Sequence, residues 1–330
     1  MTFDIYAFAD YSASSPISEQ RKHIVLALYD RQHGKVQTLR GLSRAELWIK
    51  MYSLLAKATT EGRRVLFGFD HSYTFPSGFY QTLMGKEVSQ WSELLTFLSE
   101  GNDTLPPLGE PIPVAHYGQL VKTYYTDASS QEALKWLAAR FESTTLPRDW
   151  AASVNEWFAK NYLAHPLGGP FWGPNFHSQI TKPAFPFGPD IREKRLVETY
   201  CQSLNRMTMK SIYQIGGNGS VGLQALYGMS YLHQLLRFCE DKDISIFAWP
   251  FDGWEPPRAA HVLLEVYPTL YNDGLRSDED DARACVTWMK EYDEQRFLLR
   301  PPVFLSDDEA QLVRLEGWVP GVGSSSRVQK

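Results

Sequence analysis

Short apolar runs at the start of the chain predict three strands. Residues 5–9 and 23–29 are aliphatic and aromatic, and residues 35–39 follow across a polar turn that ends in Gly34. Strands this close in sequence usually pair with their neighbours. We therefore predict a three-strand meander with two hairpins.

A helix and a buried strand are predicted to follow the meander. Ser43 and Glu46 have the spacing of a capping box, and apolar residues then recur at helical spacing to about Thr60. Residues 65–69 form a continuous apolar run, which is typical of a strand buried on both faces.

The pattern changes after Pro76 to helical spacing interrupted by loops rich in proline and glycine. The predicted helices cover residues 87–99, 130–142, 148–163, 190–205 and 220–240. Strand patterns return at 244–248 and 261–267, and a last helix is expected over 278–296. The prediction is an α/β protein with a mixed sheet, whose core (1–74 and 244–330) is interrupted by a helical insertion (75–243).

Composition narrows the class of protein. No run of eighteen apolar residues and no basic-then-apolar leader is present, so we expect a cytoplasmic protein with no membrane partner. The three cysteines are far apart, which argues against a disulfide framework or a zinc motif. A formal net charge of −5 weakens the case for a broad nucleic-acid surface without excluding it, and makes a small nucleotide a competing partner.

Two aspartates end predicted strands. Asp10 follows the first strand and Asp70 follows the fourth. Each could be no more than a turn residue, since aspartate is common where strands end. If the two strands lie side by side, however, both carboxylates emerge at the same edge of the sheet, where α/β proteins build their sites.

Two further acidic residues lie in apolar patterns, where a side chain that only faces solvent is less expected. Glu265 interrupts an apolar strand, and the alternative is an edge strand with Glu265 facing solvent. Asp281 begins a helix, where acids are favoured by the helix dipole, but it shares a face with the apolar residues Cys285 and Trp288. Carboxylates converging from several elements suit a hard, oxygen-seeking cation such as Mg²⁺ or Mn²⁺.

These acids also carry a family resemblance. Residues 8–14, 68–70, 264–268 and 281–285 together resemble a family of predicted RNase H-like nucleases, related to RuvC-type resolvases. The resemblance covers the two ends of the chain and implies an RNase H-like core. It also implies catalytic and metal-binding roles for Asp10, Asp70, Glu265 and Asp281, with Asp10 bridging two metal ions about 3.5–4 Å apart. Residues 210–222 and 316–319 resemble a subgroup of the same family.

A glycine-rich segment before a predicted helix forms a second candidate site. Glycines and free N–H groups at a helix start can bind a phosphate, although a plain glycine turn with Ser220 as N-cap explains the pattern equally well. It is not a Walker A motif, because the Gly-Lys-Ser/Thr ending is missing. The predicted phosphate-binding residues are Arg206, Lys210, Gly217, Gly219, Ser220 and Gln224. Arg192 and Arg195 are further candidates, in a charge run more typical of a solvated helix face.

Three functions remain open from the sequence. The first is a Mg²⁺- or Mn²⁺-dependent nuclease or phosphodiesterase acting on nucleic acid or a nucleotide, with the insertion selecting the substrate. The second is a small-molecule phosphotransferase on the same core, which is disfavoured because residues 10–14 lack the glycine usual in such phosphate loops. The third is a non-enzymatic module that binds a nucleotide or a protein partner through residues 216–220.

Overall fold

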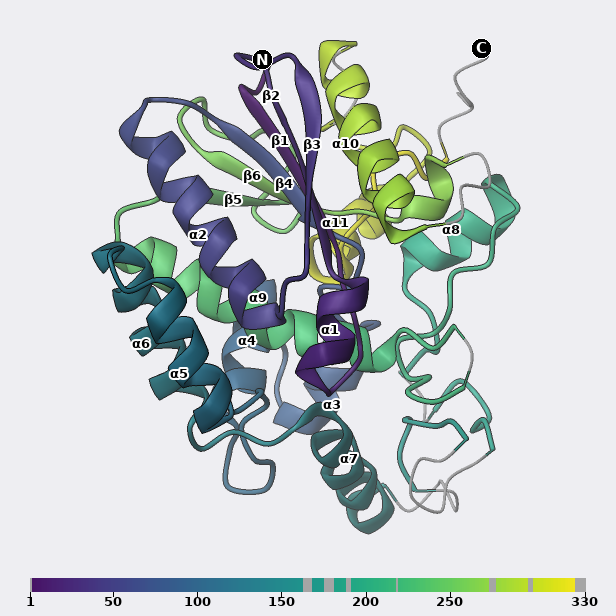
Figure 1. Cartoon of the computed structure of the whole chain (residues 1–330). Helices are drawn as coiled ribbons and strands as arrows, with labels where there is room; N and C mark the ends of the chain where they lie inside the picture. The colour runs from purple at the N-terminus through teal and green to yellow at the C-terminus, as the bar shows by residue number, and fades with distance from the viewer. Residues whose placement is uncertain are drawn as a thin grey trace.

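A six-stranded mixed sheet lies at the centre of the protein, in the order β3-β2-β1-β4-β6-β5 (Figure 1). The computed structural model describes residues 2–162, 168–174, 181–187, 191–217, 219–272, 277–295 and 299–323. The strands are β1 (Ile5–Asp10), β2 (Val25–Asp30), β3 (Lys35–Arg40), β4 (Val65–Phe69), β5 (Ile246–Trp249) and β6 (His261–Glu265). The predicted α/β class with a mixed sheet is confirmed.

The sheet has an antiparallel part and a parallel part. β1, β2 and β3 are antiparallel neighbours, whereas β4 is parallel to β1 and the pairs β4–β6 and β6–β5 are also parallel. Of the two predicted hairpins, the one between β2 and β3 is present, whereas the first is wrong, because α1 (Ile17–His23) lies between β1 and β2. Gln20 is the buried residue of α1, so the helix has no apolar stripe that a sequence pattern could reveal.

Most predicted helices are present with small shifts at their ends. They are α2 (Arg44–Thr60), α4 (Trp91–Glu100), α6 (Ala128–Phe141), α7 (Pro147–Asn161), α8 (Leu196–Leu204), α9 (Gly222–Asp241) and α10 (Asp278–Glu294). The Ser43–Glu46 capping box at the start of α2 is confirmed. Residues 163, 190 and 296, within or at the ends of predicted helices, lie outside the described residues.

Besides α1, three short helices of the described residues have no counterpart in the sequence prediction: α3 (Phe79–Met84), α5 (Val114–Thr123) and α11 (Asp307–Glu316). A single-turn 3-10 helix also follows β6 at Pro268–Leu270. Within the described ranges, no helix is both long and apolar enough to span a membrane.

The sheet is covered on both faces, and alternate residues of β1 show how. Ala7 and Ala9 belong to a core shared with α2 and α9, whereas Tyr6 and Phe8 belong to a core shared with α10. In Figure 1, α2 and α10 accordingly lie on different sides of the sheet. The insertion helices α4, α6, α7 and α9 contribute to the first of these cores, so the insertion packs directly on the sheet.

Gly68 in β4 lets the central strands approach closely. A Cβ at Gly68 would lie 2.3 Å from the carbonyl oxygen of Leu264 and 2.7 Å from Cγ2 of Val266. Real Cβ atoms do not make such contacts, so a side chain here would push β6 away from β4. Because Asp70 follows β4 directly, this packing also fixes where the end of the strand lies.

We expect Gly68→Ala to lower the free energy of unfolding by about 1–3 kcal/mol, because the added methyl overpacks the β4–β6 contact. Chemical denaturation followed by circular dichroism measures this loss. Gly118→Ala is the matched control, since Gly118 lies in α5 with open space around its Cα. That control should be neutral or stabilising, and an equal loss in both variants would contradict the packing argument.

Candidate functional site

Asp10 and Asp70 meet at the edge where β1 and β4 end. Ala9 and Phe69 are partners in the parallel ladder, so the next residue of each strand lies beside the other. Both aspartates have the strand parity of Phe8 and Leu66, which face α10. Their carboxyl groups form a hydrogen bond with each other. The predicted convergence of these two acids is therefore present in the structure.

The contact changes the protonation of both acids. Burial and the charge of Asp70 raise the pKa of Asp10 far above its usual value. Burial also raises the pKa of Asp70, to about 6, against the opposing effect of the hydrogen bonds that it receives. Two carboxylates in contact cannot both be ionised at low cost. At neutral pH the pair therefore holds a proton between its two members.

Asp70 is held in place by donors from two elements. The backbone N–H of Tyr11 donates to Oδ1 of Asp70 at 2.8 Å. Nε2 of Gln224 donates to Oδ2 of Asp70 at 2.7 Å and to the carbonyl oxygen of Tyr11 at 3.0 Å. Gln224 lies in the first turn of α9 (Gly222–Asp241). Of the residues predicted to bind phosphate, Gln224 is therefore the one with a hydrogen bond to the acidic pair.

The start of α10 adds two more carboxylates. The negative charges of Asp278 and Asp281 both raise the pKa of Asp10, so both lie near the pair. Residues three apart share one side of a helix. Asp281 accepts a hydrogen bond from Asn272, and Asp278 lies 3.2 Å from Nδ1 of His23. Asp278 is not among the predicted site residues, because helix-start preference alone explains a run of acids, but its spacing of three from Asp281 is a usable signal.

Glu265 does not join the pair. It is the ladder partner of Phe69, so it lies on the opposite face of the sheet from Asp70. Its side chain accepts two hydrogen bonds from Arg195, at 2.7 and 2.8 Å, and one from the N–H of Tyr73 at 3.3 Å. The buried charge that the sequence indicated is therefore balanced by an arginine. The expectation that Arg195 lies on a solvated helix face is wrong, because it is fully buried.

The glycine-rich segment has the backbone freedom expected of it. Gly217 and Gly219 have φ angles of +89° and +70°, which favour glycine, and Lys210 runs alongside Gly219. Lys210 and Arg206 are exposed. The prediction of Ser220 as N-cap is wrong: Val221 occupies that position and makes no side-chain cap. The backbone serves this helix start instead, since the N–H of Gly222 donates to the carbonyl of Gln214.

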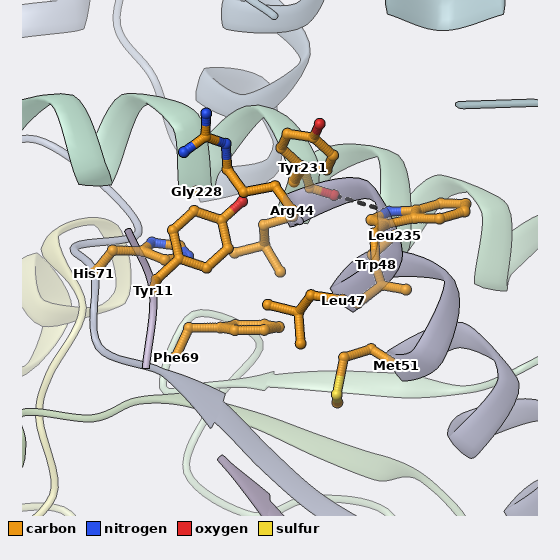
Figure 2. A pocket seen from close by; sticks show the side chains of 11 residues that line it. Tyr11, Arg44, Leu47, Trp48, Met51, Phe69, His71, Gly228, Tyr231 and Leu235 are labelled. Atoms are coloured by element: carbon orange, nitrogen blue, oxygen red, sulfur yellow. Dashed lines mark hydrogen bonds between the residues drawn. The ribbon is translucent and has the colours of Figure 1, made fainter. Parts of the chain in front are cut away.

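Tyr11 is one of the residues that line a small cavity, whose side chains Figure 2 shows. Its volume is about 20 Å³, and Arg44, Phe69, His71 and Gly228 are among its lining residues. Burial lowers the pKa of His71 to about 4, so this imidazole is neutral, and its ring fits against α9 only because Gly228 has no Cβ. The space suits about one water molecule rather than a substrate. Access to the carboxylates is therefore expected from the side of α10, where Asp278 is 42% exposed.

The carboxylates around Asp10 are also candidate ligands for a metal ion. Within the described ranges, no group of three or more His, Cys, Asp or Glu side chains is placed to hold a metal. The carboxylates around Asp10 nevertheless offer oxygen ligands, which suit Mg²⁺ or Mn²⁺ in kind. Two softer groups lie near them: His23 contacts Asp278, and burial and the charges of Asp70, Asp10 and Asp281 raise the pKa of the Cys285 thiol. The chemistry of the site therefore fits a hard cation.

Comparisons with known proteins do not identify this site. No family model, curated protein or solved structure matches the chain.

We expect Asp10→Asn to stabilise the protein by about 1–2 kcal/mol at neutral pH, since each pKa unit corresponds to about 1.4 kcal/mol. The folded state of the wild type retains a proton above about pH 4, where the unfolded chain releases it, so its stability falls as pH rises. The amide avoids this loss, and the gain should grow with pH and vanish in acid. Urea denaturation across this range measures it.

Asp30→Asn is a control of opposite sign. Burial opposes the ionisation of Asp30, but hydrogen bonds from Arg63 and from the N–H of Gln32 hold its pKa below the usual value. Removing this carboxylate should therefore lower stability at neutral pH, with the loss disappearing in acid. A loss of stability in Asp10→Asn would mean that the pair is not strained as described.

Proposed function

We propose that this protein is a divalent-cation-dependent phosphodiester hydrolase built on an RNase H-like core. The observation that carries the proposal is the contact between Asp10 and Asp70 at the ends of two parallel strands, with Asp278 and Asp281 nearby on α10. Buried acids with strongly raised pKa values are typical of functional sites.

The arrangement of elements supports an RNase H-like core. Three antiparallel strands are followed by β4, which lies parallel to β1, and α10 packs on the same strands. This order agrees with the fold implied by the resemblance of residues 8–14, 68–70 and 281–285. Most helices of the insertion pack on the opposite face of the sheet from α10, whereas α8 contributes Val197 and Cys201 to the core that α10 shares.

In this proposal Asp10 and Asp70 would hold Mg²⁺ or Mn²⁺, with Asp281 as the third carboxylate. A cation at this position supplies charge stabilisation and an acidified water molecule. Tyr11 and Gln224 fix the orientation of Asp70 through hydrogen bonds to both of its oxygens. The proton shared by the pair must leave before a cation binds, so cation affinity should rise with pH.

The substrate class in this proposal is nucleic acid or a nucleotide. Exposed Lys210 and Arg206, at or near the glycine-rich segment, offer positive charge for a phosphate. The net charge of −5 favours a short or compact substrate over a long duplex, because a long polyanion requires an extended basic surface.

We expect the wild type to bind Mn²⁺ in calorimetric titrations and to cleave single-stranded oligonucleotides or a chromogenic phosphodiester in its presence. Asp10→Asn and Asp70→Asn should each lower the cleavage rate by about 100-fold or more, because each removes a cation ligand and its charge. Asp30→Asn is the control, since Asp30 lies at the far end of β2 from the site. Its cleavage rate should match that of the wild type.

The proposal fails if the wild type cleaves neither substrate with Mn²⁺ or Mg²⁺. It also fails if Asp10→Asn cleaves and binds Mn²⁺ as the wild type does. A nucleotide-dependent rise in melting temperature without any cleavage would support a binding module instead.

A further inference from the structure

Each member of the acidic pair begins the same three-residue motif, an aspartate followed by an aromatic residue and a serine. Asp10-Tyr11-Ser12 ends β1 and Asp70-His71-Ser72 follows β4. The middle residues of the two motifs meet, with the ring centroids of Tyr11 and His71 5.0 Å apart. Each serine, two residues beyond its aspartate, is in turn contacted by a fully buried arginine.

Arg44 holds the first motif. It begins α2 and its Nη1 donates to the carbonyl oxygen of Ser12 at 2.6 Å. Its other donors form a two-point ion pair with Glu110, at 2.8 and 2.5 Å. The guanidinium also lies 3.7 Å from the centroid of the Tyr227 ring. All three guanidinium nitrogens of Arg44 are thus engaged, and Nη1 fixes the backbone beyond Asp10.

Arg195 contacts the second motif at the corresponding serine, through the side-chain hydroxyl instead of the backbone. Its Nη2 donates to Oγ of Ser72 at 3.1 Å, and both terminal nitrogens pair with Glu265. Glu265 accepts from the N–H of Tyr73, so the backbone next to Ser72 is held as well. Glu198 occupies Nε of Arg195 at 2.8 Å. The side chain of Arg195 is therefore as fully engaged as that of Arg44.

We propose that Arg44 and Arg195 are positioning residues that keep Asp10 and Asp70 in contact. Each aspartate lies where a strand passes into a loop, so the two carboxyl groups stay in contact only if neither loop moves away. Charge-assisted hydrogen bonds from rigid, buried guanidinium groups oppose that movement at the same place in both loops.

Both ion pairs also join the core to the insertion. Arg44 lies in the first part of the core and its partner Glu110 in the insertion, whereas Arg195 lies in the insertion and its partner Glu265 in the second part of the core. The insertion therefore supplies one member of each ion pair, in addition to the substrate selection expected of it.

A double-mutant comparison tests the positioning role without any metal. Asp10→Asn is combined with Arg44→Lys, with Arg195→Lys, and with the control Arg63→Lys. Arg63 forms a partly buried ion pair with Asp30, 2.5 Å in length, at the opposite end of β4 from Asp70. Lysine keeps the charge but lacks the planar fork of arginine. Thermal melting at neutral pH gives the increase in melting temperature caused by Asp10→Asn in each background.

We expect this increase to fall by half or more in the Arg44→Lys and Arg195→Lys backgrounds, because carboxylates that can separate no longer strain the fold. It should be unchanged beside Arg63→Lys. An undiminished increase in all backgrounds overturns the proposal. If the lysine variants do not fold, Glu110→Gln and Glu265→Gln replace them, and failure of all four to fold also overturns it, since the pairs would then serve the whole fold.

The consequence for binding rests on the proposed function and is measured separately. Mn²⁺ affinity should fall about 10- to 100-fold in Arg44→Lys and Arg195→Lys, the range typical of residues that orient metal ligands, and stay unchanged in Arg63→Lys. Equal affinity in all folded variants counts against the positioning role. If the wild type binds no Mn²⁺, the proposed function fails, whereas the melting comparison still decides this inference.

Discussion

The contact between Asp10 and Asp70 is the constraint on which the rest of this structure depends. The parallel register of β1 and β4 places the two carboxylates side by side, and both residues are half-buried, so water screens them only in part. A proton, hydrogen bonds to Asp70, and the close packing at Gly68 make that arrangement tolerable. A protein under selection for stability alone would replace one of these acids, because the contact strains the fold.

The amino-terminal turn of α10 adds negative charge beside the acidic pair. The helix packs on β1 and β2 with its amino-terminal turn toward the pair, and that turn carries further acids instead of the basic residues that would neutralise it. Negative charge is thus accumulated where the structure could have balanced it. A site that concentrates carboxylates in this way is suited to recruit positive charge from solution, which is what a phosphoryl-transfer centre requires.

The sequence predicted the site where local rules apply and failed where distant partners decide. Asp10 and Asp70 could be brought to one edge because both follow strands that are expected to be neighbours. For Glu265 the sequence indicated a buried charge that needs a partner, but neither the face of β6 nor Arg195, seventy residues away, could be derived from it. Asp278 was hidden in a run of acids that helix preference alone explains, and α1 has no apolar stripe.

The two arginine pairs also bear on how the chain folds. Arg44 and Glu110 are 66 residues apart and Arg195 and Glu265 are 70 apart, so each pair closes a long loop. Closing long loops is costly in chain entropy, and contacts of this kind form after local ones. The first strands and α2 can assemble early. If Arg44 and Arg195 position the acidic pair as proposed, the two carboxyl groups reach their final geometry only when the insertion has docked, and a chain that is still being synthesised lacks the completed pair.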